Sequence, residues 1–279
     1  MAMNSPALEA FKLEEVSYNY LDGIPALREI SFTVTRGERV VILGANGSGK
    51  STLLKLLDGL YFPTTGEIRA FGVPLTERML QGAYAFRRRV GLVFQDPDVQ
   101  LFSPTVWDEV AFAPLQLGLP QEEVAARVEG ALQALGIAKL RDRAPYNLSE
   151  GEKKKVALAS LLSLNPEVWL LDEPTANLDP RSRGWAIDFL LSLADQDKTL
   201  VVATHDLEIA DIVAQQVYVL GEDHHLTAQG SPQEILADEE LLWRTNLIHQ
   251  HRHLHAGIEH RHPHGHWAAH QHPSERLCG

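Results

Sequence analysis

The sequence of 279 residues is poor in cysteine and contains no long apolar run. Its single cysteine, Cys278, is the next-to-last residue, so no internal disulfide can form, and this predicts a reducing compartment. The most apolar segment, 156–171, is interrupted by two serines, an asparagine, a proline and a glutamate. It therefore lacks the roughly 20 successive apolar residues that cross a bilayer. Residues 1–9 have no basic start followed by an apolar block, so no secretory leader is expected.

Basic residues are scarce as well. The chain has 25 Lys and Arg against 37 Asp and Glu, a net charge of −12. Nucleic-acid binding depends on clustered basic side chains that displace counterions, and the one notable basic run, Arg87-Arg88-Arg89, is short. The composition argues against a nucleic-acid surface, and membrane association would require a partner protein. The length and the 44% hydrophobic content suit one substantial core with a subdomain.

A glycine-rich loop lies between a predicted strand and a predicted helix. It follows the apolar run 39–43 and precedes the helix-forming residues 53–57. Three glycines would let successive backbone amides turn inward and hold phosphate oxygens at the helix N-terminus. Lys50 would reach the β- and γ-phosphates, and the Ser51 hydroxyl would ligate Mg²⁺. The bare pattern arises by chance in roughly one chain of this length per hundred, but the strand and helix around it favour nucleotide binding. The loop consists of Gly44, Ala45, Asn46, Gly47, Ser48, Gly49, Lys50, Ser51 and Thr52.

Two further apolar runs end in polar side chains. The run 168–171 leads into Asp172 and Glu173, and the run 198–203 leads to His205. Because parallel strands deliver such residues to the edge where phosphates bind, Asp172 would hold Mg²⁺ through water and Glu173 would lie beside the γ-phosphate. His205 could donate to a γ-phosphate oxygen. Taken singly, two carboxylates at a strand end more often form only a solvated turn, and a single histidine there is more often structural than catalytic.

The remaining pattern predicts a mixed α/β chain with a helical insertion. Antiparallel strands are expected at 13–20 and 30–34, before the strand at 39–43. Helical periodicity dominates between 104 and 140, and Ser149 with Glu152 forms a capping box for another helix. Tyr18 or Tyr20 could stack on an adenine ring, although core packing is the more frequent role of such residues. Further strands are expected at 66–71, 89–94, 168–172, 198–203, 217–220 and 226–229, and further helices at 181–193 and from Ser231.

The C-terminal residues are rich in histidine and poor in apolar side chains. This composition predicts a mobile tail, and imidazole suits nickel, cobalt, zinc and copper. A purification tag or a solvated tail that binds metal incidentally are the alternatives. The candidate metal ligands are His249, His251, His253, His255, His260, His262, His264 and His266, with His270 and His272 following.

Taken in order from Leu13 to about Leu236, these motifs resemble the nucleotide-binding subunit of ATP-binding-cassette (ABC) transporters. The glycine-rich loop is similar to the Walker A motif, Gln95 to the Q-loop, LSEGE at 148–152 to the signature motif, VWLLDEP at 168–174 to the Walker B motif and His205 to the switch histidine. Residues 177–179 resemble the D-loop, which includes Asp179, and family alignment implies Tyr20 as the adenine-stacking aromatic. The departure is in the signature, where LSGGQ is usual: Glu150 replaces glycine and Glu152 replaces glutamine. Ser149 and Gly151, the positions that the resemblance places near the partner's γ-phosphate, are retained.

The resemblance implies an α/β P-loop NTPase fold of the ABC ATPase type. It would combine a RecA-like mixed sheet, an antiparallel β-subdomain and a helical subdomain at about 97–163, within a cassette at 1–246 that precedes a tail at 247–279. Two chains would pack head to tail, with ATP between the phosphate loop of one and Ser149 and Gly151 of the other. Ser51, Gln95 and Asp172 would hold Mg²⁺, while Glu173 would polarise the attacking water and His205 would stabilise the γ-phosphate.

Residues 94–102 and 105–112 resemble the energy-coupling-factor importers, and most of all their cobalt/nickel ATPase component (CbiO-like). The implied partners are a membrane coupling subunit and a substrate-specific membrane subunit, at the cytoplasmic face of the membrane. Apolar residues of 95–112 could form the docking surface or pack within the insertion: Phe102, Val106, Trp107 and Phe112. Alternative functions are the same motor in a vitamin importer or a soluble ABC ATPase that acts on nucleic acid or ribosomes.

Overall fold

The structure is a computed structural model that describes residues 8–80, 84–255 and 258–264, with the backbone alone described for 249–255 and 258–264. Its centre is a six-stranded sheet in the order β10-β9-β3-β8-β7-β6. Five strands run parallel, and β10 is antiparallel to β9. Strands β3, β7 and β8 are buried along almost their whole length, as expected for apolar runs covered on both faces of a parallel sheet. The strands are β3 (Arg39–Gly44), β6 (Val90–Val93), β7 (Val168–Asp172), β8 (Thr199–Thr204), β9 (Gln216–Leu220) and β10 (Leu226–Gly230).

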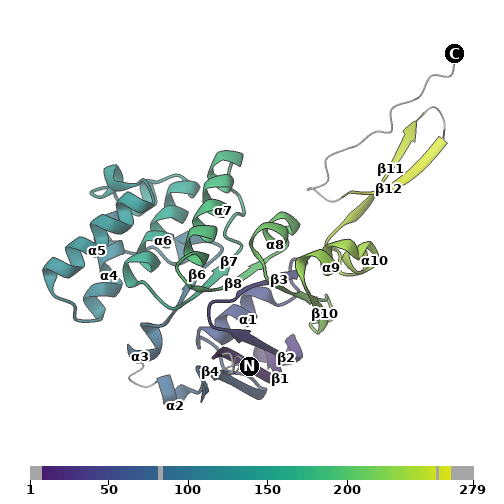
Figure 1. Ribbon diagram of the computed structural model, residues 1–279, viewed down its shortest axis with the longest axis horizontal. Helices are drawn as coiled ribbons and strands as arrows, with labels where there is room; N and C mark the ends of the chain where they lie inside the picture. The colour runs from purple at the N-terminus through teal and green to yellow at the C-terminus, as the bar shows by residue number, and fades with distance from the viewer. Residues whose placement is uncertain (1–7, 81–83, 256–257, 265–279) are drawn as a thin grey trace, which may run out of the picture.

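A second, antiparallel sheet in the order β2-β1-β4-β5 lies below the central sheet in Figure 1. Helix α1 (Lys50–Leu57) packs between the two sheets, so its leucines join one core with Val16, Ile30 and Ile42. The predicted strand at 13–20 begins earlier and ends at Asn19, because the 3₁₀ turn at Leu21–Gly23 follows directly. The strands of this sheet are β1 (Glu9–Asn19), β2 (Pro25–Thr35), β4 (Thr65–Ala70) and β5 (Val73–Pro74).

The predicted helical insertion contains α4 (Val106–Gln116), α5 (Gln121–Ala134) and α6 (Glu150–Leu164). The three helices pack on one another at the left of Figure 1. The predicted apolar face of α5 is buried, as Val124 and Val128 illustrate. The 3₁₀ turn η2 (Pro97–Val99) precedes α4, and two others, η3 (Ala138–Leu140) and η4 (Pro145–Asn147), lie between α5 and α6.

The remaining helices flank the central sheet or connect its strands. They are α2 (Glu77–Leu80), α3 (Tyr84–Arg87), α7 (Pro180–Ala194), α8 (Leu207–Val213), α9 (Pro232–Ala237) and α10 (Glu239–Arg244). Ser231 caps α9 with Pro232 at the first helical position, as the sequence predicts, and Glu234 completes a capping box that was not predicted. Ile248 is buried in the main core and Leu247 packs against it, so the packed chain extends two residues beyond the predicted cassette end. No helix within the described residues is both long and apolar enough to cross a membrane.

Beyond Ile248 the backbone forms an antiparallel hairpin, β11 (His249–His255) with β12 (Ile258–His264), which extends away from the cassette in Figure 1. The composition of these residues does not predict strands, although histidine at every second position is compatible with the two-residue period of a strand. The mobility of this tail stays a prediction. His266, His270 and His272 lie outside the described residues.

Candidate active site

The glycine-rich loop joins β3 to α1, as the sequence predicts. Gly47 and Gly49 have φ of +86° and +110°, in the left-handed region that favours glycine. A Cβ on Gly49 would lie 2.3 Å from the carbonyl oxygen of Ala26, so this position also requires glycine for a close backbone approach. The loop therefore leads directly into the N-terminus of α1, an arrangement that suits phosphate.

The loop forms one wall of a cavity of about 520 Å³. That volume lies within the usual range for small-molecule sites, roughly 300–1,000 Å³. The cavity brings together residues that are far apart in the chain. It is lined by Tyr20, Ile24, Pro25, Ala26, Asn46, Gly47, Gly49, Lys50, Ser51, Thr52, Gln95, Glu173 and His224.

Lys50 lies at the base of this cavity. Its buried ammonium donates to the carbonyl oxygens of Gly44 (2.8 Å) and Ala45 (3.1 Å) and lies 3.5 Å from Oε1 of Glu173. Burial lowers the pKa of Lys50, and the nearby carboxylate opposes that effect. Phosphate oxygens bound in the cavity could therefore replace these carbonyl oxygens as hydrogen-bond acceptors of Lys50.

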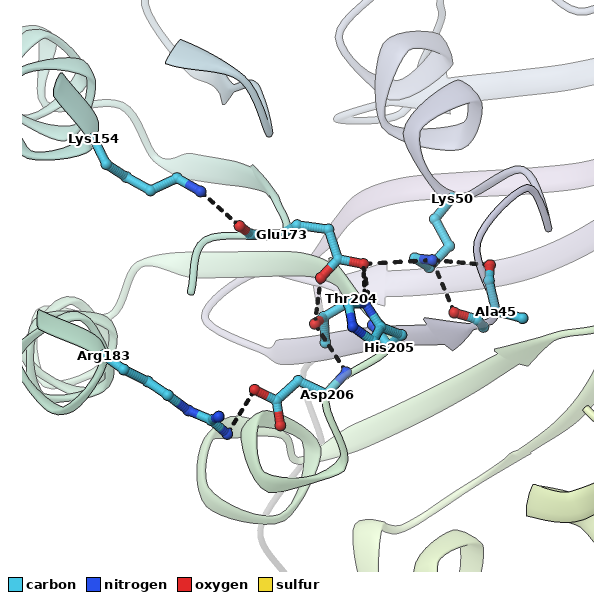
Figure 2. A network of polar contacts seen from close by, with 9 residues as sticks. Ala45, Lys50, Lys154, Glu173, Arg183, Thr204, His205 and Asp206 are labelled. Carbon is cyan, nitrogen blue, oxygen red and sulfur yellow. Dashed lines mark hydrogen bonds and ion pairs between the residues drawn. The ribbon is translucent and has the colours of Figure 1, made fainter. Parts of the chain in front are cut away.

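Glu173 is the centre of the polar network in Figure 2. Its Oε2 accepts from the Thr204 hydroxyl (2.8 Å), and its Oε1 lies 2.8 Å from Nδ1 of His205 and accepts from the His205 amide (3.1 Å). Burial works against ionisation, but the bonds from His205 and Thr204 and the charge of Lys50 prevail and lower the pKa of Glu173. The carboxylate is therefore held ionised, the state required to accept a proton from water.

The backbone of Glu173 is in the left-handed region, with φ of 45°. For a residue other than glycine this costs roughly 1–3 kcal/mol. The residue directly follows β7, and its amide donates to the carbonyl oxygen of Ala203 in the neighbouring strand (2.8 Å). The strained turn thus aims the carboxylate across the sheet edge toward Thr204 and His205.

His205 lies between Glu173 and solvent, with 53% of its side chain exposed. The hydrogen bond to Glu173 raises the pKa of His205, and burial opposes this. The carboxylate therefore holds the ring outside the core, where it lines a neighbouring cavity of about 300 Å³ that also includes Glu173.

Asp172 is buried at the end of β7, and its Oδ1 atom has no hydrogen-bond partner among the described residues. Burial raises the pKa of Asp172, and a hydrogen bond with Ser51 opposes that rise. An unpartnered carboxylate oxygen near a hydroxyl is the type of oxygen donor set that Mg²⁺ prefers. Asp172 and Ser51, two of the three residues predicted to hold Mg²⁺, therefore fit that ion.

Two residues in the Glu173 network were missed by the sequence analysis. Thr204 directly precedes His205, and Lys154 follows the LSEGE motif. The buried Nζ of Lys154 donates to the carbonyl oxygen of Glu173 (2.8 Å; Figure 2). A lysine among the buried positions of α6 needs such an acceptor, but the sequence alone does not identify it.

Gln95 lines the phosphate-loop cavity and also a second cavity of about 370 Å³. The second cavity includes Glu150 of the signature motif and Lys154. Gln95 therefore connects the phosphate loop with the start of α6.

The signature residues surround a separate cavity of about 400 Å³, with Ser149, Gly151 and Asp179 in its lining. The predicted capping box is confirmed: the Ser149 amide donates to Oε2 of Glu152 (3.0 Å), and Ser149 Oγ accepts from the Glu152 amide. Asp179 caps α7 by accepting from the amides of Arg181 and Ser182. Within one chain these residues line a different cavity from the phosphate loop.

The two candidate aromatics differ in position. Tyr20 lines the phosphate-loop cavity, and its hydroxyl lies 2.7 Å from Oγ1 of Thr52. Tyr18 stacks on Tyr61 with parallel rings 5.2 Å apart. Tyr20 is thus the aromatic available to a base, while Tyr18 has the packing role.

The predicted docking residues also separate into two groups. Phe102 and Phe112 are 67% and 43% exposed and contact each other edge to face. Val106 is fully buried at the start of α4, and Trp107 lies under the Arg141 guanidinium. Of the two roles left open for Val106, docking or packing within the insertion, the structure shows packing, because its side chain belongs to the core.

Residues 27–176 match the family model described as ABC transporter. A putative ABC transporter ATP-binding protein of Caldanaerobacter subterraneus is 55% identical over 86% of this chain and 99% of its own length. The nickel import ATP-binding protein NikO of Rhodobacter capsulatus is 50% identical over 86% of this chain and 96% of its own. The energy-coupling factor ATP-binding protein EcfA of Methanothermobacter thermautotrophicus is 45% identical over 85% of this chain and 75% of its own.

Solved structures show the same fold. CbiO1 of Clostridium perfringens, described as part of the transporter complex CbiONQ, matches with a TM-score of 0.73 and 39% identity, over 86% of this chain and 95% of that one. A dimeric ATP-binding cassette bound to ADP and Pi matches with a TM-score of 0.72 and 28% identity, over 80% of this chain and 98% of that one.

Proposed function

Because this chain belongs to the ABC transporter family, we propose that it is the ATP-hydrolysing motor of an energy-coupling-factor-type importer of nickel or cobalt ions. The observation that carries the motor function is the ionised Glu173 held at the edge of the phosphate-loop cavity by Lys50, Thr204 and His205. A positioned carboxylate beside a phosphate-binding loop is suited to activate water for attack on a phosphoryl group.

In the proposed mechanism the loop amides and Lys50 bind the phosphates of ATP. Glu173 orients the attacking water and accepts its proton, and His205 donates a hydrogen bond to the γ-phosphate as negative charge develops there. Ser51, Asp172 and Gln95 are the proposed ligands of Mg²⁺, directly or through water. When bound, that ion would neutralise phosphate charge and help to align the phosphates. Tyr20 is the proposed support for the adenine ring.

We further propose that two chains act as a head-to-tail dimer. In one chain, Ser149 and Gly151 line a different cavity from the phosphate loop, so a second copy would be needed to bring them to the same nucleotide. Asp179, which caps α7 beside the signature, would lie at that interface. The dimeric structure of the related cassette supports this arrangement.

The proposed partners are a membrane coupling subunit and a substrate-specific membrane subunit, with this chain at the cytoplasmic face. The exposed Phe102 and Phe112 support docking near α4, because exposed apolar patches commonly mark interaction sites. The name of the CbiO1 structure, part of a transporter complex, is consistent with such partners.

Nickel or cobalt as cargo is supported by two observations. One relative is named as a nickel import protein, and the tail carries histidines whose type suits these ions. In the hairpin the backbone register sets His251 opposite His262 and His253 opposite His260. We propose that the tail binds the transported ion and so buffers or senses it, with His249, His255, His264 and His266 as further candidate ligands. Among the described side chains, which do not include those of 249–264, no group of three or more His, Cys, Asp or Glu suited to a metal ion is found.

The test is uptake of radioactive nickel or cobalt by cells that produce this chain together with its membrane partners. Replacing Glu173 with Gln should abolish energy-dependent uptake while the complex still assembles. Uptake of a vitamin with no metal uptake would support the alternative cargo. Assembly with ribosomes or nucleic acid, without membrane proteins, would support the soluble alternative, against which the net charge of −12 argues.

A further inference from the structure

The turn between β9 and β10 lies beside the phosphate loop, although no motif marked it. Strand β9 is the parallel neighbour of β3, and Leu220 at its end is in register with Gly44, the first residue of the loop. The approach is close enough that a Cβ on Gly44 would lie 2.8 Å from the Leu220 carbonyl oxygen. The turn that follows Leu220 is therefore held at the same edge of the sheet as the nucleotide site.

His224 in this turn contacts the phosphate loop directly. Its Nδ1 atom lies 3.3 Å from the carbonyl oxygen of Ser48, and its side chain lines the phosphate-loop cavity. Because a carbonyl oxygen only accepts hydrogen bonds, Nδ1 carries the proton and donates it. The contact joins two segments that are 176 residues apart in sequence.

The backbone holds His224 in an unusual conformation to make this contact. Its φ is 68°, in the left-handed region, which few residues other than glycine adopt without a cost. Its carbonyl oxygen accepts from the Arg28 amide of β2 (2.9 Å), and its own amide donates to the Gly221 carbonyl oxygen (3.0 Å). The backbone that carries the ring is thus held by β2 on one side and by the residue that follows β9 on the other.

Ser48, the residue that receives this bond, lies between Gly47 and Gly49, both with positive φ. Glycine has the largest conformational freedom of any residue, so this part of the loop would lose the most entropy when phosphate orders it. A donor anchored outside the loop limits that freedom before the nucleotide arrives, and preorganisation of this kind increases affinity.

We propose that His224 is a positioning residue for nucleotide binding, which fixes the phosphate loop through the Ser48 carbonyl and forms part of the wall of the cavity. This role concerns ATP affinity and is independent of the transported cargo. Because the contact is made before and during the reaction alike, its loss raises KM for ATP and leaves kcat unchanged.

The test uses steady-state ATP hydrolysis by the full chain with two variants of His224. His224→Gly removes the ring, and glycine adopts the left-handed φ without strain. His224→Asn keeps an amide donor close to the position of Nδ1, and asparagine tolerates the same φ. We expect KM to rise about three- to ten-fold in the glycine variant, the value of one hydrogen bond, and to stay within about two-fold in the asparagine variant.

The neighbouring His225 provides the matched control. Its ring lies 3.1 Å from the carbonyl oxygen of Asp223, in the same turn, and it is not among the residues that line the phosphate-loop cavity. His225→Asn should therefore leave KM unchanged. Thermal unfolding without nucleotide establishes that each variant is folded; if the glycine variant is not, His224→Ser, too short to reach Ser48, replaces it.

An unchanged KM in the variant that lacks the ring would overturn the proposal. So would a KM in His224→Asn as high as in His224→Gly, since the donor would then be irrelevant, or a fall in kcat in place of the rise in KM.

Discussion

At the scale of single residues, the site depends on a carboxylate that is buried and yet ionised. Burying an unpaired charge is costly, and Glu173 is paired on both carboxylate oxygens: Lys50 and His205 lie near Oε1, and Thr204 donates to Oε2. The sequence predicted Glu173 and His205 as neighbours at one sheet edge because both directly follow apolar strands. It did not predict that they bond to each other, because that depends on the turn conformation of Glu173.

The pair predicts a pH dependence of stability. Because its pKa is raised, His205 contributes to folding stability; this contribution is complete below its ordinary pKa of 6.5 and is lost as the pH rises through the raised value. The lowered pKa of Glu173 gives a contribution that is complete above 4.5 and is lost as the pH falls through the lowered value. Both contributions are therefore complete between pH 4.5 and 6.5.

We predict that His205→Ala lowers the free energy of unfolding most in that window and that its difference from the parent protein shrinks above pH 6.5. Urea unfolding of the parent and of the variant at a series of pH values measures this difference. The double variant with Glu173→Gln serves as the control, in which replacing His205 should have no such pH dependence. A difference that is constant from pH 5 to 9 would show that the pair does not couple to protonation.

At the scale of elements, the sequence predicted what is encoded locally. Ser149 and Glu152 are three residues apart, so their capping box could be recognised before the helix was seen, and the apolar runs of β3, β7 and β8 identified buried strands. The contact from Lys154 to Glu173 and the burial of Val106 could not be predicted, because each depends on a packing partner from another part of the chain. The short elements α2, α3 and β5 could not be predicted either, because each has too few residues to show a repeating pattern of apolar side chains.

Helix α4 carries both a buried residue, Val106, and a partly exposed one, Phe112. The two positions give opposite predictions for stability and docking. Phe112→Ser should leave ATP hydrolysis and the free energy of unfolding close to the parent values, because the side chain is partly exposed, but should reduce copurification with the membrane subunits. Val106→Ala should instead destabilise the fold by about 1–3 kcal/mol, because it removes buried methyl groups.

The control for Phe112 is Trp243→Ser on α10, another exposed aromatic at 57%. Copurification measured by affinity capture from detergent-solubilised membranes should fall for Phe112→Ser and not for Trp243→Ser. Equal retention of the membrane subunits by both variants would exclude Phe112 from the docking surface.

At the scale of the whole molecule, the boundary between the cassette and the tail lies directly after Ile248. Leu247 and Ile248 pack on the main core, so a truncated chain should end at Ile248 and not before. We predict that this truncation leaves ATP hydrolysis unchanged and alters metal-dependent uptake. Equilibrium dialysis with Ni²⁺ should show metal bound by the full chain and lost on truncation, and transport that is identical at every metal concentration would contradict a role of the tail in uptake.

The nucleotide site is incomplete in one chain, and this is the claim on which the account depends most. Light scattering during gel filtration of the Glu173→Gln variant, with and without ATP and Mg²⁺, tests it directly. The account predicts that ATP converts a 31.0 kDa chain to a species of twice that mass, and that adding Ser149→Ala restores the single chain. A mass that stays at one chain in saturating ATP would contradict it.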